Sequence, residues 1–474
     1  MRYLTLDYWA NLFGYTKASR LELTQGEPTH DEDHERMDIS HARATREALR
    51  WMSANNADIA SVNQADRSGI IGQGVNIQCR NKKHPETNRP IEEFIRKWSK
   101  KQNCELTGRW HANGLYRSMV EFENKDGGFL VRHHYNTRWP IPYRPELIEL
   151  GMIDAAKYDE EKRIFNGLKR DRYGRITHIY IYDSQRRTTS SPVSAKELTY
   201  YAPVWITISQ YTAVSRLSAA LPTIDKLDRY SDAELQAALE RAKAGKYWKT
   251  VLYDDIMKVV RNLKDQYERK TELTTLMAAI RKQGVSPQGL SPIPREDEIV
   301  TGDRPSDTIY GDLTTNSKQN IASAAGMSSQ IVYQDPSKSN YSAIKAMMAF
   351  ASIYWSTRFD DLCEMVLSDI MYRVIRAGVE IGEVDAPGFH EKPDDFLNLD
   401  YMRVSEIDIE PKKTADADKQ RLENGTISKR ELVRRRGRDY EAVIEEQIDD
   451  EILREQIRAR KYAEAGIPLP GEEK

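Results

Sequence analysis

A polar loop that runs directly into a long apolar helix constrains this chain more than any other feature. The sequence from Gly326 to Trp355 reads GMSSQIVYQDPSKSNYSAIKAMMAFASIYW. Gly326 is typical of a helix end, because glycine adopts the left-handed turn at little cost. The polar stretch 334–342 follows, and then apolar residues near the 3.6-residue period predict a long helix from Tyr341 to Ala377. Such a direct transition indicates a special task for the loop.

Length and composition set broad limits. A chain of 474 residues should form more than one domain, and its net charge of −2 advertises neither nucleic-acid nor membrane binding. Cys79, Cys104 and Cys363 match no metal-ligand spacing, which predicts reduced cytosolic thiols. There is no signal-like N-terminal stretch and no run near the ~18 apolar residues of a membrane span. We therefore expect a soluble protein.

Periodicity predicts mixed helix and strand structure. After a polar arm at 1–36, a helix capped by Ser40 and three further helices are expected, at 56–67, 90–101 and 110–122. The segment from about 128 to 211 predicts strands: GGFLVRHHY at 127–135, 146–155 with its turn, a hairpin at 164–183, and 193–205. Helices return at 217–248, 255–283 and 313–325, before the long helix and a highly charged helical C-terminus.

Motifs that carry chemistry are absent from the sequence. No phosphate-binding loop occurs, and the glycines of GIIGQG (69–74) precede a strand, which indicates a turn instead of a dinucleotide site. His133 and His134 are adjacent on a strand and therefore point to opposite faces. Acidic and histidine residues are also clustered near the N-terminus, but a solvated linker is favoured over a metal site there: Asp31, Asp33, His34 and His41. We expect no enzyme activity, no metal and no cofactor.

A basic run near the C-terminus has two interpretations. Lys429 to Arg438 reads KRELVRRRGR and is followed at once by the acidic run DYEAVIEEQIDDE. The basic side chains could contact DNA as a patch. The favoured alternative is that the two runs neutralise each other, within a subunit or between neighbours. The residues concerned are Arg434, Arg435, Arg436 and Arg438.

The order of these segments resembles the portal proteins of tailed bacteriophages, the lambda-like branch in particular. The resemblance covers about residues 38–445. It rests on ARATREALR, ADRSGIIGQGVNIQCR, GGFLVRHH, PELIELGMID, IFNGLKRDRYGRITHIYIYD, VSRLSAALPTIDKLDRYSDAELQAALERAKAG, NIASAAGMSSQIVYQDPSKSNYSAIKAMM and PKKTADADKQRLENGTISKRELVRRRGRDYEAVIEEQ. The expected helix at 255–283 and the proline-rich segment after it match no family pattern. The bounds of the part that contains them, the clip of a portal subunit, are therefore less well defined than those of the other parts.

The resemblance implies an α+β portal fold with a mixed α/β wing, a helical stem, a small α/β clip and a helical crown. The implied parts are an N-terminal arm at 1–36, the wing at 37–215 and 343–410, a stem helix at 216–249, the clip at 250–308, a second stem helix at 309–328, the tunnel loop at 329–342, and the crown or C-terminal helical region at 411–474.

Two sets of side chains would face DNA in such a ring. In the tunnel loop they are Lys338, Ser339, Asn340 and Tyr341; one lysine per subunit would touch phosphates without reading bases. The alternative is that Lys338 faces a neighbouring subunit or a carboxylate such as Asp335. Along the stem, acidic residues come early and basic ones late, as the helix dipole favours, although an ordinary amphipathic helix explains this equally well. The possible channel-lining residues are Arg241, Lys243, Lys246 and Lys249.

The resemblance implies a structural protein of the virion, assembled in the host cytoplasm and placed at one capsid vertex. The expected partners are further copies of the chain in a ring of twelve, the double-stranded DNA genome, the terminase large subunit, a head–tail adaptor and the major capsid protein. No membrane is involved. Two alternatives remain: a nucleic-acid-processing enzyme such as a metal-dependent nuclease, and a monomeric α+β interaction protein.

Overall fold

The computed structural model of the chain describes residues 34–183, 187–203, 210–243, 246–249, 271, 275, 290–293, 308–337, 339–403 and 411–465. Two compact units are present. One contains the described residues up to Leu221 and from Lys318 onward, and the other those of Pro222–Ser317. Within the described residues, no helix is both long and apolar enough to cross a membrane.

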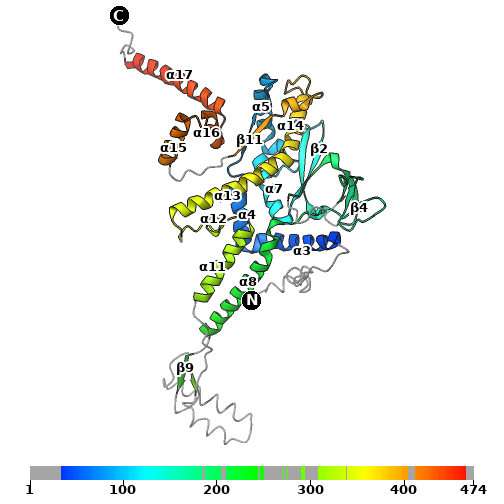
Figure 1. The fold of residues 1–474 in the computed structure, drawn as a ribbon, viewed down its shortest axis with the longest axis vertical. Coiled ribbons are helices and arrows are strands. Elements are labelled where there is room, and N and C mark those ends of the chain that lie inside the picture. The colour runs from blue at the N-terminus through cyan, green and yellow to red at the C-terminus, as the bar shows by residue number, and fades with distance from the viewer. Residues whose placement is uncertain are drawn as a thin grey trace. The chain divides into compact units, whose positions relative to one another are not determined.

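The described part of the larger unit begins with helices, among which α3, α4 and α7 pack on one another (Figure 1). They are α3 (His34–Asn55), α4 (Ala57–Ile70), α5 (Asn88–Trp98), α6 (Lys101–Cys104) and α7 (Ala112–Asp126). Asn56 begins α4 by accepting hydrogen bonds from the backbone N–H groups of Asp58 and Ile59. The predicted apolar face of α5 is confirmed, because Phe94, Ile95 and Trp98 are buried. The first helix starts at His34, so the prediction that Ser40 caps it was wrong.

Three sheets follow in this unit. Their strands are β1 (Val75–Cys79), β2 (Phe129–Tyr135), β3 (Tyr143–Glu149), β4 (Ile164–Phe165), β5 (Leu168–Arg170), β6 (Ile176–Tyr182), β7 (Ser190–Ser194), β8 (Leu198–Tyr201) and β11 (Leu399–Arg403). They pair antiparallel as β1-β11, β3-β2-β8 and β4-β5-β6-β7. A shared core joins the last two sheets, with Leu130 from one and Ile179 from the other.

Local signals explain most of these strands. In the predicted hairpin, the Asp171 carboxylate accepts from the N–H groups of Tyr173 and Arg175, and Gly174 has a φ of 84°, which confirms the turn. The segment 193–205 was expected to be one strand segment. It instead contributes to two strands, β7 and β8, which belong to different sheets, because a 3₁₀ turn at Ala195–Glu197 separates them.

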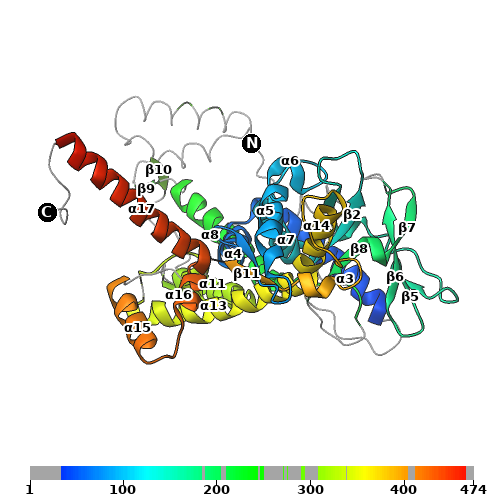
Figure 2. The ribbon, with the colours of Figure 1, turned by 90° about the horizontal axis from the view of Figure 1, so that it is seen from above.

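The second half of this unit is mostly helical. Its helices are the end of α11 (Thr308–Ala324), α12 (Ser329–Val332), α13 (Tyr341–Leu362), α14 (Ser368–Glu380), α15 (Pro411–Glu423), α16 (Lys429–Arg435) and α17 (Tyr440–Ala465). Gly326 has a φ of 76°, which confirms the expected left-handed helix end. A single π-helical turn, Cys363–Leu367, joins α13 to α14, so the predicted long helix is confirmed with an interruption. Figure 2 shows the two helices continuing one another.

The smaller unit contains most of α8 (Leu221–Lys243), the start of α11, and the parallel pair β9 (Lys246–Lys249) and β10 (Leu290–Ile293). The rings of Tyr230 and Tyr310 stack with centroids 5.7 Å apart, which ties α8 to α11. The predicted stem helix was too long, because it ends at Lys243 and residues 246–249 form a strand. The glycine at position 245 and the aromatic pair after it disfavour a helix there. The helix predicted at 255–283 falls on residues almost all of which lie outside the described ranges.

Candidate functional site

The loop between α12 and α13 is exposed, and hydrogen bonds between its own residues stabilise its conformation. The side chains of residues 334–337 are exposed, and Gln334 has a φ of 52°. The Asp335 carboxylate accepts from the N–H of Ser337 at 3.0 Å, and the N–H of Ser339 donates to the Pro336 carbonyl at 3.0 Å. Lys338 lies outside the described residues. Both interpretations of this lysine therefore stay predictions.

The end of this loop is fixed by a helix cap. Asn340 is extended, and its side-chain oxygen accepts from the N–H of Ala343 at 2.8 Å. This bond satisfies one of the free donors of the first turn of α13. Tyr341, the first residue of the helix, is 39% exposed. The predicted tunnel loop, 329–342, thus contains the short helix α12, a polar loop and the start of α13.

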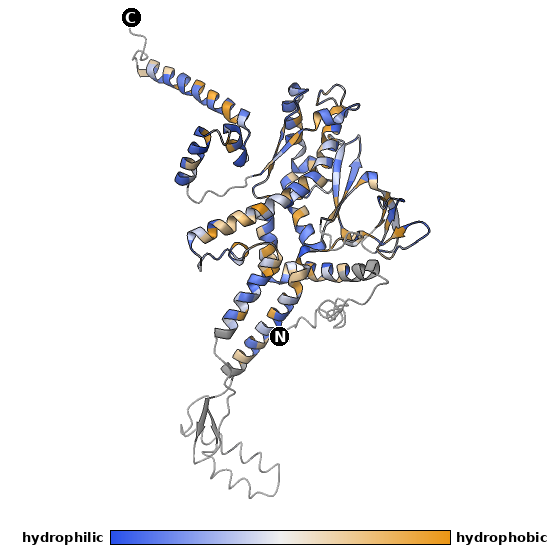
Figure 3. Cartoon of the chain, in the orientation of Figure 1, coloured by the Kyte–Doolittle hydropathy of each residue, from blue (hydrophilic) through white to orange (hydrophobic). Residues whose placement is uncertain are grey.

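One face of α13 is buried and another exposes large apolar side chains. Trp355, Phe359 and Leu362 are buried, whereas Phe350 is 73% exposed and Ile353 is 66% exposed. Figure 3 shows apolar colour along much of this helix. A helix that is apolar on all sides is usually buried on all sides. The exposed face therefore marks a surface suited to contact with another molecule.

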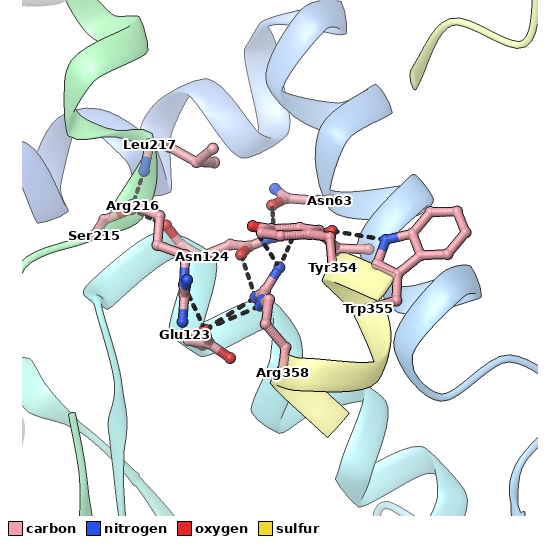
Figure 4. Close-up of polar contacts among 10 residues, drawn as sticks. Asn63, Glu123, Asn124, Ser215, Arg216, Leu217, Tyr354, Trp355 and Arg358 are labelled. Atoms are coloured by element: carbon pink, nitrogen blue, oxygen red, sulfur yellow. Dashed lines mark hydrogen bonds and ion pairs between the residues drawn. The ribbon is translucent and has the colours of Figure 1, made fainter. Parts of the chain in front are cut away.

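A buried arginine fastens α13 to the helices behind it (Figure 4). The Arg358 Nη1 atom lies 2.6 Å from an Asp66 oxygen on α4, and its Nη2 atom lies 3.1 Å from an oxygen of Glu123 on α7. Nη2 also donates to the Asn124 side-chain oxygen at 2.9 Å. All three charged side chains are 2% exposed or less. Burial disfavours the charge on Arg358, but the two carboxylates outweigh it and raise its pKa well above the usual value.

The same network reaches the chain segment that leads into α8. The Arg216 Nε atom lies 3.0 Å from the Glu123 oxygen that Arg358 also contacts. The Ser215 hydroxyl donates to the backbone carbonyl of Asn124 and accepts from the N–H of Leu217. Glu123 therefore joins the helix that follows the polar loop to the start of the predicted stem (Figure 4).

Trp355 also belongs to the network around Arg358. Its indole N–H donates to Asp66 at 3.3 Å, and its ring covers Gly69 so closely that a Cβ there would lie 2.1 Å from ring atoms. The sequence analysis missed this network. Its members lie up to 292 residues apart in the chain. The one signal in the sequence was a charged residue, Arg358, within the apolar stripe of a predicted helix.

The predicted stem lining is divided between two elements. Arg241 and Lys243 belong to the last turn of α8, while Lys246 and Lys249 belong to β9, so the four cannot lie along one helix as expected. Their side chains lie outside the described part of the chain. Their contact with DNA stays a prediction.

The C-terminal basic run is largely neutralised by carboxylates of the same chain. Arg434 contacts Asp400 at 2.5 Å, Arg430 contacts Glu441 at 2.9 Å, and Arg438 pairs with Glu446. Two further arginines belong to this run, Arg435, which lies 3.7 Å from Glu431, and the exposed Arg436. These pairs support the structural interpretation of the run, and contact with DNA stays a prediction.

The histidine pair behaves as predicted. His133 is buried, with Nδ1 2.8 Å from the Tyr143 hydroxyl and Nε2 2.9 Å from Asp369, whereas the Nε2 of His134 contacts Glu146 on the other side of the strand. Burial lowers the pKa of His133. The acidic and histidine residues at positions 31–41 have side chains outside the described ranges. In the described part, no group of three or more His, Cys, Asp or Glu side chains could hold a metal ion.

Comparison with known proteins gives consistent matches. The family model described as phage portal protein, lambda family, matches residues 24–358. A relative named probable portal protein, from Halomonas phage phiHAP-1, is 22% identical over 450 residues, which are 90% of this chain and 82% of the relative. The neck of an empty GTA particle computed with C6 symmetry aligns with 88% of this chain and 98% of that chain, at 14% identity and a TM-score of 0.44. The neck of a native GTA particle computed with C12 symmetry covers 82% and 92%, at 14% identity and a TM-score of 0.42.

Proposed function

The chain belongs to the lambda family of phage portal proteins, whose model matches more than half of its residues, and we propose that copies of it form a ring that conducts double-stranded DNA. The family match carries this proposal. The ring is expected to have twelve subunits and to sit at one capsid vertex of the virion after assembly in the host cytoplasm. The role is structural, with no catalytic step assigned to any residue.

The exposed face of α13 supports the assembly into a ring. Phe350 and Ile353 lie one turn apart on a helix whose other face is packed against α4. Burying such side chains against a neighbouring subunit removes apolar surface from water, which contributes about 25 cal/mol per Å². In a ring with closed symmetry, this face would meet a different surface of the next copy, because head-to-tail contacts are heterologous.

The polar loop supports the contact with DNA. Residues 334–337 carry no large apolar side chain and are exposed, as a segment that slides along phosphates requires. The loop is short and capped at Asn340, so it would keep a fixed position on the channel wall. We infer that Lys338, Ser339, Asn340 and Tyr341 face the DNA. We also infer that four basic residues at the end of α8 and in β9 add positive charge further along the channel: Arg241, Lys243, Lys246 and Lys249.

We also propose a division of the subunit into parts, which the resemblance to the family supports. We assign the wing to 37–215 and 343–410, the stem to α8 and α11, the clip to 250–308 and the crown to 411–474. The terminase large subunit, a head–tail adaptor and the major capsid protein are the partners expected for these surfaces.

A direct test combines imaging with two matched variants. The purified full chain is examined by negative-stain electron microscopy and mass photometry, with rings that have a central hole expected. Phe350→Asp should abolish rings without unfolding the subunit, because the side chain is 73% exposed. Tyr173→Asp is the control, since Tyr173 is 69% exposed on the β5–β6 turn. A wild-type chain that stays monomeric at high concentration and physiological salt would overturn the proposal. Rings formed equally by the Phe350 variant would refute only the assigned interface.

A further inference from the structure

A cavity lies in the larger unit beside α3, and none of its lining residues belongs to the Arg358 network. Its volume is about 310 Å³. Its walls combine apolar side chains with arginines: Leu150, Ile153, Leu168, Tyr200, Arg46, Arg50 and Arg187 belong to the lining. This volume is at the lower end of the range of small-molecule sites, about 300–1,000 Å³. The cavity can therefore hold a small ion or molecule and excludes a nucleic-acid duplex.

Arginines from two parts of the chain converge in this cavity. Arg46 and Arg50 are one turn apart on α3, and Arg187 comes from the connection between β6 and β7. Gly151 leaves a space beside the guanidinium groups of Arg50 and Arg187. A Cβ on Gly151 would lie 3.2 Å from a terminal nitrogen of Arg187 and 3.5 Å from both terminal nitrogens of Arg50. The guanidinium groups of Arg50 and Arg187 thus approach a common point.

The charges in the cavity are not balanced. Arg50 is paired with Asp126 and lies 2.8 Å from Glu149, and the exposed Arg43 pairs with Glu47 at the edge. No hydrogen bond or ion pair is found for Arg46 or Arg187 among the described residues, and the Nε of Arg46 is buried without a hydrogen-bond partner.

Such an arrangement is costly without a further anion. Burying a cation without a partner is unfavourable, and here burial lowers the pKa of Arg46 despite the opposing effect of Asp126. Positive charge on neighbouring Arg50 and Arg187 acts in the same direction as burial. An anion in the cavity would relieve both the missing hydrogen bond and the repulsion.

We propose that this cavity binds a small oxyanion, a phosphate or a carboxylate, held by Arg46 and Arg187 with Arg50 beside them. A guanidinium group presents planar N–H donors that match phosphate and carboxylate oxygens in pairs. The apolar side chains in the lining, Leu150, Ile153 and Leu168, would contact the hydrocarbon part of a carboxylate ligand. This inference does not depend on the ring or on DNA.

Isothermal titration calorimetry on the full chain tests the site. Inorganic phosphate and succinate are titrated separately, and the ionic strength is kept constant with a chloride salt. We expect saturable binding of at least one of them, with a dissociation constant in the millimolar range or tighter. Arg46→Met and Arg187→Ala should each weaken it by about tenfold or more. Arg376→Met is the control and should leave binding within about threefold, because Arg376 does not line the cavity and already pairs with Glu380.

The outcomes separate clearly. Binding of phosphate alone, or of succinate alone, supports the site and identifies which oxyanion it prefers. Absence of saturable binding of both by the wild-type chain overturns the proposal, as does equal binding by the two cavity variants. Arg187 is exposed and unpaired among the described residues, so its variant keeps the test valid even when Arg46→Met lowers stability.

Discussion

Replacing Arg358 by methionine should strongly destabilise the larger unit. Methionine is close in length and fills most of the space, so the main effect is the loss of the cation. Asp66 and Glu123 would then be left with 1% and 2% exposure and no buried counter-charge. Breaking a buried pair in this way costs about 3–5 kcal/mol.

The structure places the expected cost in the lower part of that range. Glu123 keeps Arg216, which is 25% exposed, and Asp66 keeps hydrogen bonds from Asn124 and Trp355. Each carboxylate therefore loses its buried cation, but Glu123 retains the more exposed Arg216 and Asp66 retains two neutral hydrogen-bond donors. We expect a loss of about 3 kcal/mol in the free energy of unfolding.

Urea denaturation followed by tryptophan fluorescence measures this loss, since Trp355 belongs to the network. Arg434→Met is the matched control. Arg434 is 41% exposed, and such an ion pair contributes about 0–1 kcal/mol. Adding Asp66→Asn and Glu123→Gln to the Arg358 variant should recover part of the stability, because the buried charges are then removed. An Arg358 variant no less stable than the Arg434 control would refute the reasoning.

Three further outcomes are expected. Gly69→Ala should destabilise the subunit by about 1–3 kcal/mol in thermal or urea denaturation, because the new methyl group meets the Trp355 ring. Gly311→Ala is its control and should be neutral or stabilising, because a Cβ there meets nothing within 4 Å. Folding lowers the pKa values of His133 and Asp369, so the unfolded chain binds more protons than the folded chain in acid. The free energy of unfolding should therefore fall as the pH drops below 6.5. Denaturation at a series of pH values measures this dependence, and His133→Asn should weaken it. Lys338→Ala should leave stability within about 0.5 kcal/mol and ring assembly intact by electron microscopy, but alter DNA packaging or retention; a variant that fails to assemble would contradict this.

The sequence predicted elements well where a local pattern determines them. The turn at Gly174, the helix end at Gly326 and the apolar face of α5 each depend on residues close together in the chain, and all were confirmed. It failed where the chain changes element within a few residues. The helix predicted through Lys249 ends at Lys243 because aromatic side chains just beyond it favour a strand.

The candidate site was predicted only in part, for a physical reason. Loop polarity is visible in the sequence, but the partners of a buried charge are not, because Arg358, Asp66 and Glu123 are brought together only by the packing of three helices. The arginine cavity has the same origin. Arg46 and Arg187 are far apart in the chain and belong to different elements.

The π turn between α13 and α14 has a consequence for insertions and deletions. A residue added to an α-helix rotates everything after it by about 100°, since each turn holds 3.6 residues. The buried faces that contain Trp355 in α13 and Val374 in α14 both point into the same unit because the five residues Cys363–Leu367 correct this phase. Deleting one residue of the π turn, such as the exposed Glu364, would let the helix become regular and keep the α14 side chains in their contacts. Deleting one residue elsewhere in α13 would instead rotate those side chains by about 100°, so the π turn is the position at which a shorter chain is tolerated.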